Sequence, residues 1–206
     1  MKTVSFTRMI DGTKADYELL ADFERQHVSG TAQRLLRELK LQDEETMAGY
    51  QISRLEHALQ SASRAFEDGA DVDWIVCALL HDIGDGLAPL NHDKFAAEIL
   101  RPFVREECTW VVENHGLFQT YYFGHHYGWD RNERDRLKDH PGFQTCVDFC
   151  QYWDQVSFDP KYESKPLEFF APFVKEVFDR TAYDEKVLAA GQYAGLPLKS
   201  LIERSS

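Results

Sequence analysis

Apolar residues recur at steps of three and four along most of the chain, a spacing that predicts amphipathic helices. No alternation of apolar and polar residues is long enough to predict a β-strand. Helix boundaries are indicated by the acidic residues that begin at Asp43, by glycines after residue 83 and by Pro141. The predicted helices cover residues 17–27, 31–40, 43–67, 71–83, 91–100, 106–114, 141–153, 169–180 and 197–203.

Two stretches depart from this amphipathic pattern. Residues 74–80 are apolar on every face, so this helix is expected to be buried in the core. Residues 116–140 instead mix aromatic, histidine, glycine and charged side chains without a regular period. Such a segment is hard to bury as plain core, and we predict a loop with short helices lying over a functional site.

Composition and charge narrow the class of protein. With 206 residues, 43% of them hydrophobic, the chain is expected to form one domain with a full core. A net charge of -12 argues against nucleic acid or an anionic membrane as a partner, while a small anionic substrate would require a locally basic site. The start lacks a signal core, no apolar run spans a bilayer, and the four cysteines form no C-x-x-C pair. We therefore expect reduced thiols and a cytoplasmic protein.

The buried run ends in His81 and Asp82, two side chains that are costly to leave unpaired in a core. His57 lies on its predicted helix opposite the stripe of Leu55 and Leu59, so it is either a surface residue or directed into a polar cavity. The set of candidate ligands is larger than one catalytic metal with open positions needs, which favours a dinuclear centre bridged by Asp82. The predicted metal ligands are His57, His81, Asp82, His92, His115 and Asp154.

Three motifs resemble the HD-domain superfamily of metal-dependent phosphohydrolases and oxygenases. They are LEHALQSA around His57, LLHDIGD around His81 and Asp82, and WDQ around Asp154. The resemblance implies an all-α helical bundle with a metal site in its core. Within a single domain we expect an N-terminal helical extension (1–40), a metal-binding core (43–160) and C-terminal helices (166–206).

Two further motifs narrow the resemblance to the members that hold two metals. NHDKFAAEIL contains His92 and VVENHGLF contains His115. Within that subset the chain is similar to the diiron oxygenases, namely myo-inositol oxygenase and the oxygenase that cleaves the carbon–phosphorus bond of 2-amino-1-hydroxyethylphosphonate. The similarity implies a mixed-valence Fe(II)/Fe(III) pair that uses O2 and a small organophosphonate substrate.

The positions that would contact the substrate differ from that second oxygenase. Tyr50 and Met47 replace a glutamate and a tyrosine, Asp85 replaces a histidine, and Gln119 replaces a phosphonate-binding lysine. Aromatic faces with a carboxylate nearby can hold a quaternary ammonium. The chain is thus more similar to the oxygenases that convert 1-hydroxy-2-(trimethylammonio)ethylphosphonate to glycine betaine and phosphate, with Asp85 as the predicted catalytic residue. The predicted substrate-binding residues are Tyr50, Phe118, Gln119, Tyr122, His125, His126 and Arg131, with Arg134 as an alternative to Arg131.

Two other functions stay open at this point. A phosphohydrolase on the same fold would use Mn, Mg or Zn to activate water and would not need His92 and His115. A non-catalytic sensor would bind no transition metal. The sequence also leaves open whether residues 1–40 pack on the core, close the site or form a homodimer contact.

Overall fold

The computed structural model describes residues 2–44 and 49–199, and these residues form helices but no β-strand. The predicted all-α fold is therefore confirmed. The main helices are α1 (Lys14–Ser29), α2 (Thr31–Glu44), α3 (Arg54–Glu67), α4 (Val72–Leu80), α5 (His92–Leu100), α6 (Glu106–Phe123), α7 (Phe143–Asp148) and α8 (Leu167–Phe178). The short helical elements are η1 (Met9–Asp11), η2 (Gly124–Tyr127), η3 (Glu133–Leu137), η4 (Phe149–Asp154) and α9 (Glu185–Leu188).

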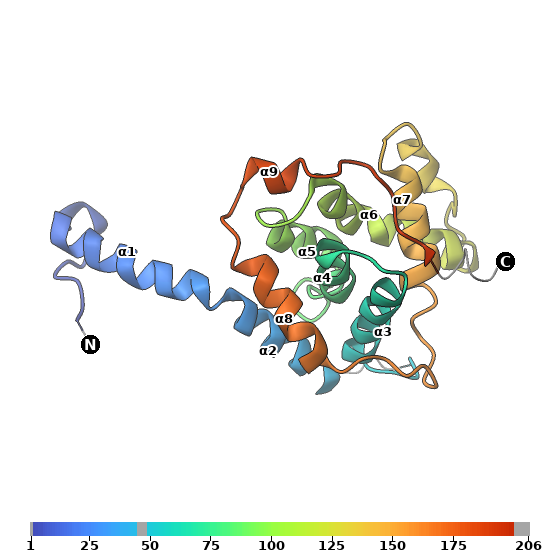
Figure 1. Ribbon diagram of the computed structural model, residues 1–206, viewed down its shortest axis with the longest axis horizontal. Coiled ribbons are helices and arrows are strands. Elements are labelled where there is room, and N and C mark those ends of the chain that lie inside the picture. Colours follow the sequence, from blue (N-terminus) through green and yellow to red (C-terminus); the bar gives the residue numbers. More distant parts are fainter. Residues whose placement is uncertain (1, 45–48, 200–206) are drawn as a thin grey trace.

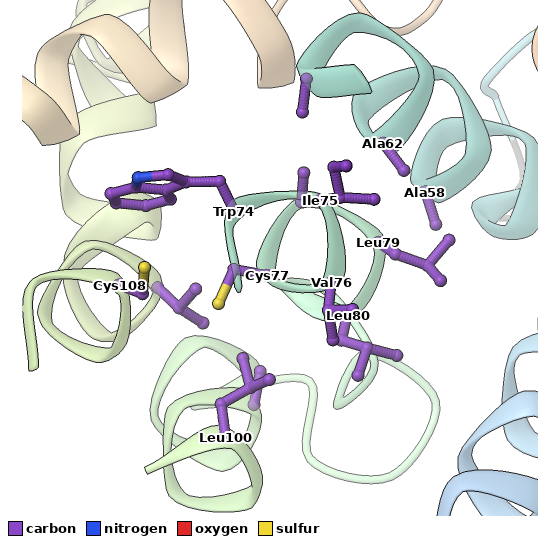
Figure 2. Close-up of a cluster of buried hydrophobic side chains, with 14 of the residues drawn as sticks. Ala58, Ala62, Trp74, Ile75, Val76, Cys77, Leu79, Leu80, Leu100 and Cys108 are labelled. Atoms are coloured by element: carbon purple, nitrogen blue, oxygen red, sulfur yellow. The ribbon is translucent and has the colours of Figure 1, made fainter. Parts of the chain in front are cut away.

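Helix α4 lies at the centre of the core, as its apolar sequence predicts. Every residue from 73 to 80 is buried, and α4 packs against α3, α6 and α8. Figure 2 shows its side chains pointing in several directions, with Trp74 and Leu79 on opposite sides of the helix. Because α4 is enclosed on every side, the residue that follows it, His81, enters the core as well and is fully buried.

Helix α1 extends away from this core, with the N-terminus at its far end (Figure 1). Asp16 is its only buried residue, and it caps α1 by accepting hydrogen bonds from the backbone N–H groups of Thr13 and Ser5. The chain joins the core at α2, where Leu35 and Leu39 are buried and the helix packs against α3 and α8. The first part of the predicted extension therefore contributes no apolar side chain to the core.

The prediction of one helix over residues 43–67 is wrong at its start. Helix α2 continues past residue 43, and α3 begins only at Arg54. Ser53 caps α3, because its side chain accepts the backbone N–H of Glu56 while the Glu56 carboxylate accepts the backbone N–H of Ser53. Residues 45–48 of the predicted helix lie outside the described residues, and so does the predicted substitution at position 47.

Two other segments also differ from the prediction. Helix α6 continues through Gly116, so the first part of the segment 116–140 is helical rather than irregular. A glycine inside a helix costs about 1 kcal/mol relative to alanine, whereas the continued helix buries Phe118 completely, a gain of roughly 1.5–3 kcal/mol. Beyond α7, η4 is a π-helix, a wider turn of the kind often found at functional sites, and Asp154 is its last residue.

The remaining predicted helices are placed well. Those over residues 91–100 and 169–180 closely match α5 and α8, whereas α9 was not predicted. The predicted helix over 197–203 extends past residue 199 and lies mostly outside the described residues. In the part of the chain that the structure describes, no helix is both long and apolar enough to cross a membrane.

Candidate metal centre

The six predicted metal ligands come from five segments of the chain and converge beside the core. They are His57 on α3, His81 and Asp82 directly after α4, His92 at the start of α5, His115 on α6 and Asp154 at the end of η4. His57 is 5% exposed, so the structure shows the inward position of the two that its helix face allowed. Gly84 lets α5 approach, because a Cβ atom there would lie 2.9 Å from backbone atoms of His92.

The first group of ligands consists of three buried side chains that can hold a metal ion, His57, His81 and Asp154. The Nε2 atoms of His57 and His81 lie 3.1 Å apart. Asp154 Oδ1 lies 3.3 Å from His57 Nε2 and 3.6 Å from His81 Nε2. Asp82 adds its Oδ2 atom, which lies 3.5 Å from each of the two Nε2 atoms.

The other oxygen of Asp82 faces a second group of ligands. Asp82 Oδ1 lies 3.0 Å from His115 Nε2 and 3.3 Å from His92 Nε2. The two oxygens of one carboxylate therefore point to two different pairs of imidazoles. Asp82 is therefore shared by two groups of side chains, each of which could hold a metal ion.

Backbone carbonyls orient three of the four histidines. The Nδ1 atoms of His57, His81 and His115 lie 2.8, 2.9 and 2.6 Å from the carbonyl oxygens of Ser157, Ala78 and Val112, respectively. A carbonyl oxygen can only accept a hydrogen bond, so the proton of each neutral ring lies on Nδ1 and the lone pair on Nε2. Hydrogen bonds of this kind fix the ring of a metal-binding histidine and select its tautomer.

A carboxylate orients the fourth histidine. His92 Nδ1 lies 3.3 Å from Asp85 Oδ1, and Asp85 in turn forms an ion pair with Arg54. Asp85 therefore orients the His92 ring through its Nδ1 atom, which leaves Nε2 to face the metal site. Asp85 also lines the cavity described below, and the catalytic role predicted for it stays a prediction.

Burial and ion pairing act in opposite directions on these side chains. Burial lowers the pKa of His57, but Asp154 and Asp82 raise it more, so that the pKa of His57 reaches about 10. Burial also lowers the pKa of His115, and Asp82 overrides it to raise that pKa to about 9. For Asp82 and Asp154 burial raises the pKa, and the neighbouring histidines lower it below its usual range. Without a metal, the two histidines carry protons at neutral pH to balance the two carboxylates.

The site has features that a bound cation would satisfy. Asp154 Oδ2 is buried and has no hydrogen-bond partner among the described residues. The Nε2 atoms of His57 and His81 face each other while both Nδ1 atoms are engaged with carbonyls. An unpaired buried carboxylate oxygen beside converging imidazoles is costly without a cation. Imidazole and carboxylate donors suit iron, manganese or zinc, so the residues fit a metal centre.

A cavity of about 460 Å³ opens onto these ligands. The ligand side chains on its wall are His57, Asp82, His92, His115 and Asp154. The rest of the wall is made by Tyr50, Ile52, Ser53, Arg54, Asp85, Pro89, Gly116, Gln119, Tyr122, Phe123, Gln155 and Phe158. A cavity of this size accommodates a small molecule in contact with the metal ligands.

Part of the predicted substrate shell lines the cavity. Tyr50, Gln119 and Tyr122 all contribute to the wall. Phe118 does not line the cavity: it is fully buried, and the centre of its ring lies 5.2 Å from that of Phe143. The reason is the helical continuation of α6: consecutive helical residues point about 100° apart, so of Phe118 and Gln119 only Gln119 faces the cavity.

The residues predicted beyond α6 to contact the phosphonate do not line the cavity either. His125 and His126 lie exposed on η2 and do not line the cavity. Arg131 lies with its guanidinium 4.1 Å from the centre of the Tyr121 ring, and Arg134 lies 3.8 Å from the same ring. These residues lie elsewhere because the long helix α6 carries the chain past the cavity before the segment turns.

Arg54 and Phe158 are two of the cavity-wall residues that sequence reasoning missed. Arg54 lies three positions before His57 on the same face of α3, and that spacing could have identified it. The Phe158 ring stacks on the His57 imidazole at 4.4 Å and on the Tyr50 ring at 5.3 Å. Phe158 lies far along the chain from both, so no local pattern connects them. We refer to Tyr50 and Phe158 as the aromatic wall.

Comparison with known protein families agrees with this site. Residues 54–143 match the model of the HD domain family, and the match contains every proposed ligand except Asp154. No curated protein matches the chain. Proteins with HD domains are generally metal-dependent enzymes, either hydrolases or oxygenases. Residues 54–143 are therefore similar to an HD domain, and the buried cluster of histidines and aspartates can bind a metal ion.

Proposed function

We propose that this protein is a diiron oxygenase that oxidises a 1-hydroxyphosphonate with O2 and cleaves its carbon–phosphorus bond. The substrate that we favour is 1-hydroxy-2-(trimethylammonio)ethylphosphonate. In the balanced reaction, substrate and O2 give glycine betaine and phosphate. The bonds from the hydroxyl-bearing carbon to hydrogen and phosphorus break, that carbon becomes a carboxylate, and O2 is the four-electron oxidant.

The observation that carries this proposal is the position of Asp82 between two groups of imidazoles. A centre for a single metal needs only the first group and one oxygen of Asp82. The second oxygen lies 3.0 Å from His115 Nε2 and 3.3 Å from His92 Nε2. A mononuclear site would not require these contacts, whereas ligands that share a second ion are expected to make them.

Backbone carbonyls and Asp85 hold the histidine rings, and the cavity opens onto the ligands. Two irons bound there would supply the redox chemistry that O2 activation needs. The residues of the chain orient the substrate beside them and limit the access of water.

The aromatic wall supports the choice of a quaternary ammonium substrate. Tyr50 and Phe158 stack beside His57, and Tyr122 and Phe123 line the same cavity. A trimethylammonium group cannot donate a conventional hydrogen bond, and aromatic faces attract it by roughly 0.5–2 kcal/mol per contact. A primary amine would instead require acceptors such as the glutamate that Tyr50 replaces.

The test is to purify the protein from iron-replete cells and measure metal content, anaerobic EPR and Mössbauer spectra, and phosphate release. We expect two irons per chain, a mixed-valence signal that changes when the substrate is added, and phosphate release that requires O2. His92→Ala should lower the metal content to about one ion per chain. One redox-inert metal, with O2-independent hydrolysis of phosphate esters, would instead identify a phosphohydrolase.

A further inference from the structure

We infer that Gln60 and Arg64 are positioning residues that hold residues 156–159 against α3, and that through this segment they fix the imidazole of His57 and the ring of Phe158. The effect on His57 concerns the metal centre whichever ion it holds. Only the effect on Phe158 rests on the proposed function, for the quaternary ammonium group that its ring would contact. Residues 156–159 follow η4 and belong to no helix or strand. Their position therefore depends on the side chains that contact them.

The face of α3 that contacts this segment is formed by His57, Gln60 and Arg64. Their spacing of three and four residues places them along one side of the helix. Each of them donates a hydrogen bond to a backbone carbonyl of the segment. The donors are Arg64 Nη2, His57 Nδ1 and Gln60 Nε2, which lie 3.0, 2.8 and 2.8 Å from the carbonyl oxygens of Val156, Ser157 and Asp159, respectively.

Gln60 and Arg64 each make a second contact with the segment. The backbone N–H of Asp159 donates to Gln60 Oε1 at 3.3 Å, so the Gln60 amide binds both polar backbone groups of that residue. Gln60 is 3% exposed, and an amide at that depth would be costly without such partners. Arg64 Nε donates to the Ser157 hydroxyl at 3.1 Å, and this hydroxyl donates to the carbonyl of Trp153 at 2.5 Å. The planar guanidinium thus binds the segment at two points, which the single ammonium of a lysine does not match.

The groups of the segment that face the site lie between these contacts. The carbonyl of Ser157 orients the His57 ring, and the ring of the next residue, Phe158, stacks on it with 4.4 Å between the ring centres. A shift of the segment would move both groups, because they are neighbours on one backbone. Removing outer contacts of this kind typically weakens metal binding about 10- to 100-fold. The metal ligand and the aromatic wall should therefore respond together to changes at Gln60 or Arg64.

The first experiment measures Zn²⁺ affinity by calorimetry in a double-mutant cycle of Gln60→Met and His57→Gln. Gln60→Met keeps the length of the side chain but removes its hydrogen-bonding groups. We expect it to weaken binding at the first group of ligands roughly 10- to 100-fold, and to have no effect in His57→Gln, which lacks the imidazole that the segment orients. Arg64→Lys lies at a half-buried position and should cause a smaller loss, because it keeps the charge but not the fork. Gln151→Met is the matched control, since Gln151 is exposed and does not line the cavity.

The second experiment measures choline binding to the Zn²⁺-loaded protein. Phe158→Leu removes an aromatic face and should weaken choline binding roughly 2- to 30-fold, the range of one cation–π contact. Gln60→Met and Arg64→Lys should also weaken it, because they release the segment that carries Phe158. Gln60→Met should add no further loss in the Phe158→Leu background.

Two results of the metal titration would overturn the inference. One is a Zn²⁺ affinity in Gln60→Met and Arg64→Lys equal to that of the wild type. The other is an equal loss with and without the His57 imidazole, which would mean that Gln60 does not act through that ring. An unchanged choline affinity in Gln60→Met, with a weakened one in Phe158→Leu, would refute the link to Phe158. If the wild type binds no choline, the proposed quaternary ammonium substrate fails, while the metal titration still decides the positioning of His57.

Discussion

Metal binding should expel protons from the site, and the structure sets how many. In the metal-free protein the pKa of His57 is about 10 and that of His115 about 9, because the buried carboxylates outweigh the effect of burial. Both rings are protonated at pH 7, and each must lose a proton before its Nε2 atom can bind a metal. One of these protons belongs to each ligand group. We therefore expect about two protons to be released when two ions bind at pH 7.

The same protons make the apparent affinity depend on pH. Between pH 7 and 8.5 each pH unit should strengthen the binding of each ion about tenfold, which corresponds to about 1.4 kcal/mol. The dependence should flatten as the pH passes 9 for the group of His115 and 10 for the group of His57. The stability of the metal-free protein should instead fall as the pH rises. Histidines with raised pKa stabilise the fold fully below about pH 6.5, and this contribution is lost as the pH rises through 9 to 10.

Calorimetric titration with Mn²⁺ or Zn²⁺ in buffers of different ionisation enthalpy counts the released protons. A metal-bound water can also release a proton, so the decisive comparison is with His57→Gln, which should release one proton fewer at the first group. His140→Gln is the matched control, because His140 stacks on Trp110 away from the ligands and should leave the count unchanged. An affinity that does not change between pH 7 and 8.5, or an equal proton count in His57→Gln, would refute the reasoning.

Three further predictions follow from the same contacts. Asp85→Asn keeps the size of the side chain but removes the charge that faces His92, so the second ion should bind roughly 10- to 100-fold more weakly by metal titration, and an equal loss at both groups would contradict this. Leu80→Ala removes a fully buried side chain of α4 and should lower the free energy of unfolding of the metal-free protein in urea by about 2–5 kcal/mol, whereas a change below about 1 kcal/mol would place α4 outside the core. Deleting residues 2–29 removes no apolar core side chain, so Tm and metal content should stay close to those of the full chain, and a loss of either would show that α1 supports the site.

Local pattern was sufficient for several elements. The apolar run 74–80 predicted a buried helix because no face of it is polar, and α4 is buried on every side. The spacing around His57 predicted a helix with an inward or outward polar face, and the motifs placed His81 and Asp82 at the end of α4. These predictions use only residues within a few turns of one another, whose relative positions a helix determines by its geometry.

Local pattern failed where two signals competed within one stretch. The acidic residues from Asp43 and the capping pair of Ser53 and Glu56 both indicate a helix start, and only the second is one. Packing decided between them, because α2 continues to Glu44 with Gln42 buried, where its side chain donates a hydrogen bond to the backbone carbonyl of Asp82. The segment from residue 116 was predicted to be irregular, but α6 continues through Gly116 and buries Phe118.

The sequence by itself determined the helical class, the buried α4 and the set of six candidate ligands. Tertiary structure decided which oxygen of Asp82 faces which group, and it decided the wall of the cavity. His57 is oriented by Ser157, 100 positions away, and Phe158 stacks on the same ring. Arg54, rather than any described lysine or arginine of residues 116–140, lines the cavity. The physical reason is that helix periodicity relates only near neighbours in the chain, whereas a cavity is enclosed by side chains that the packing of separate helices brings together.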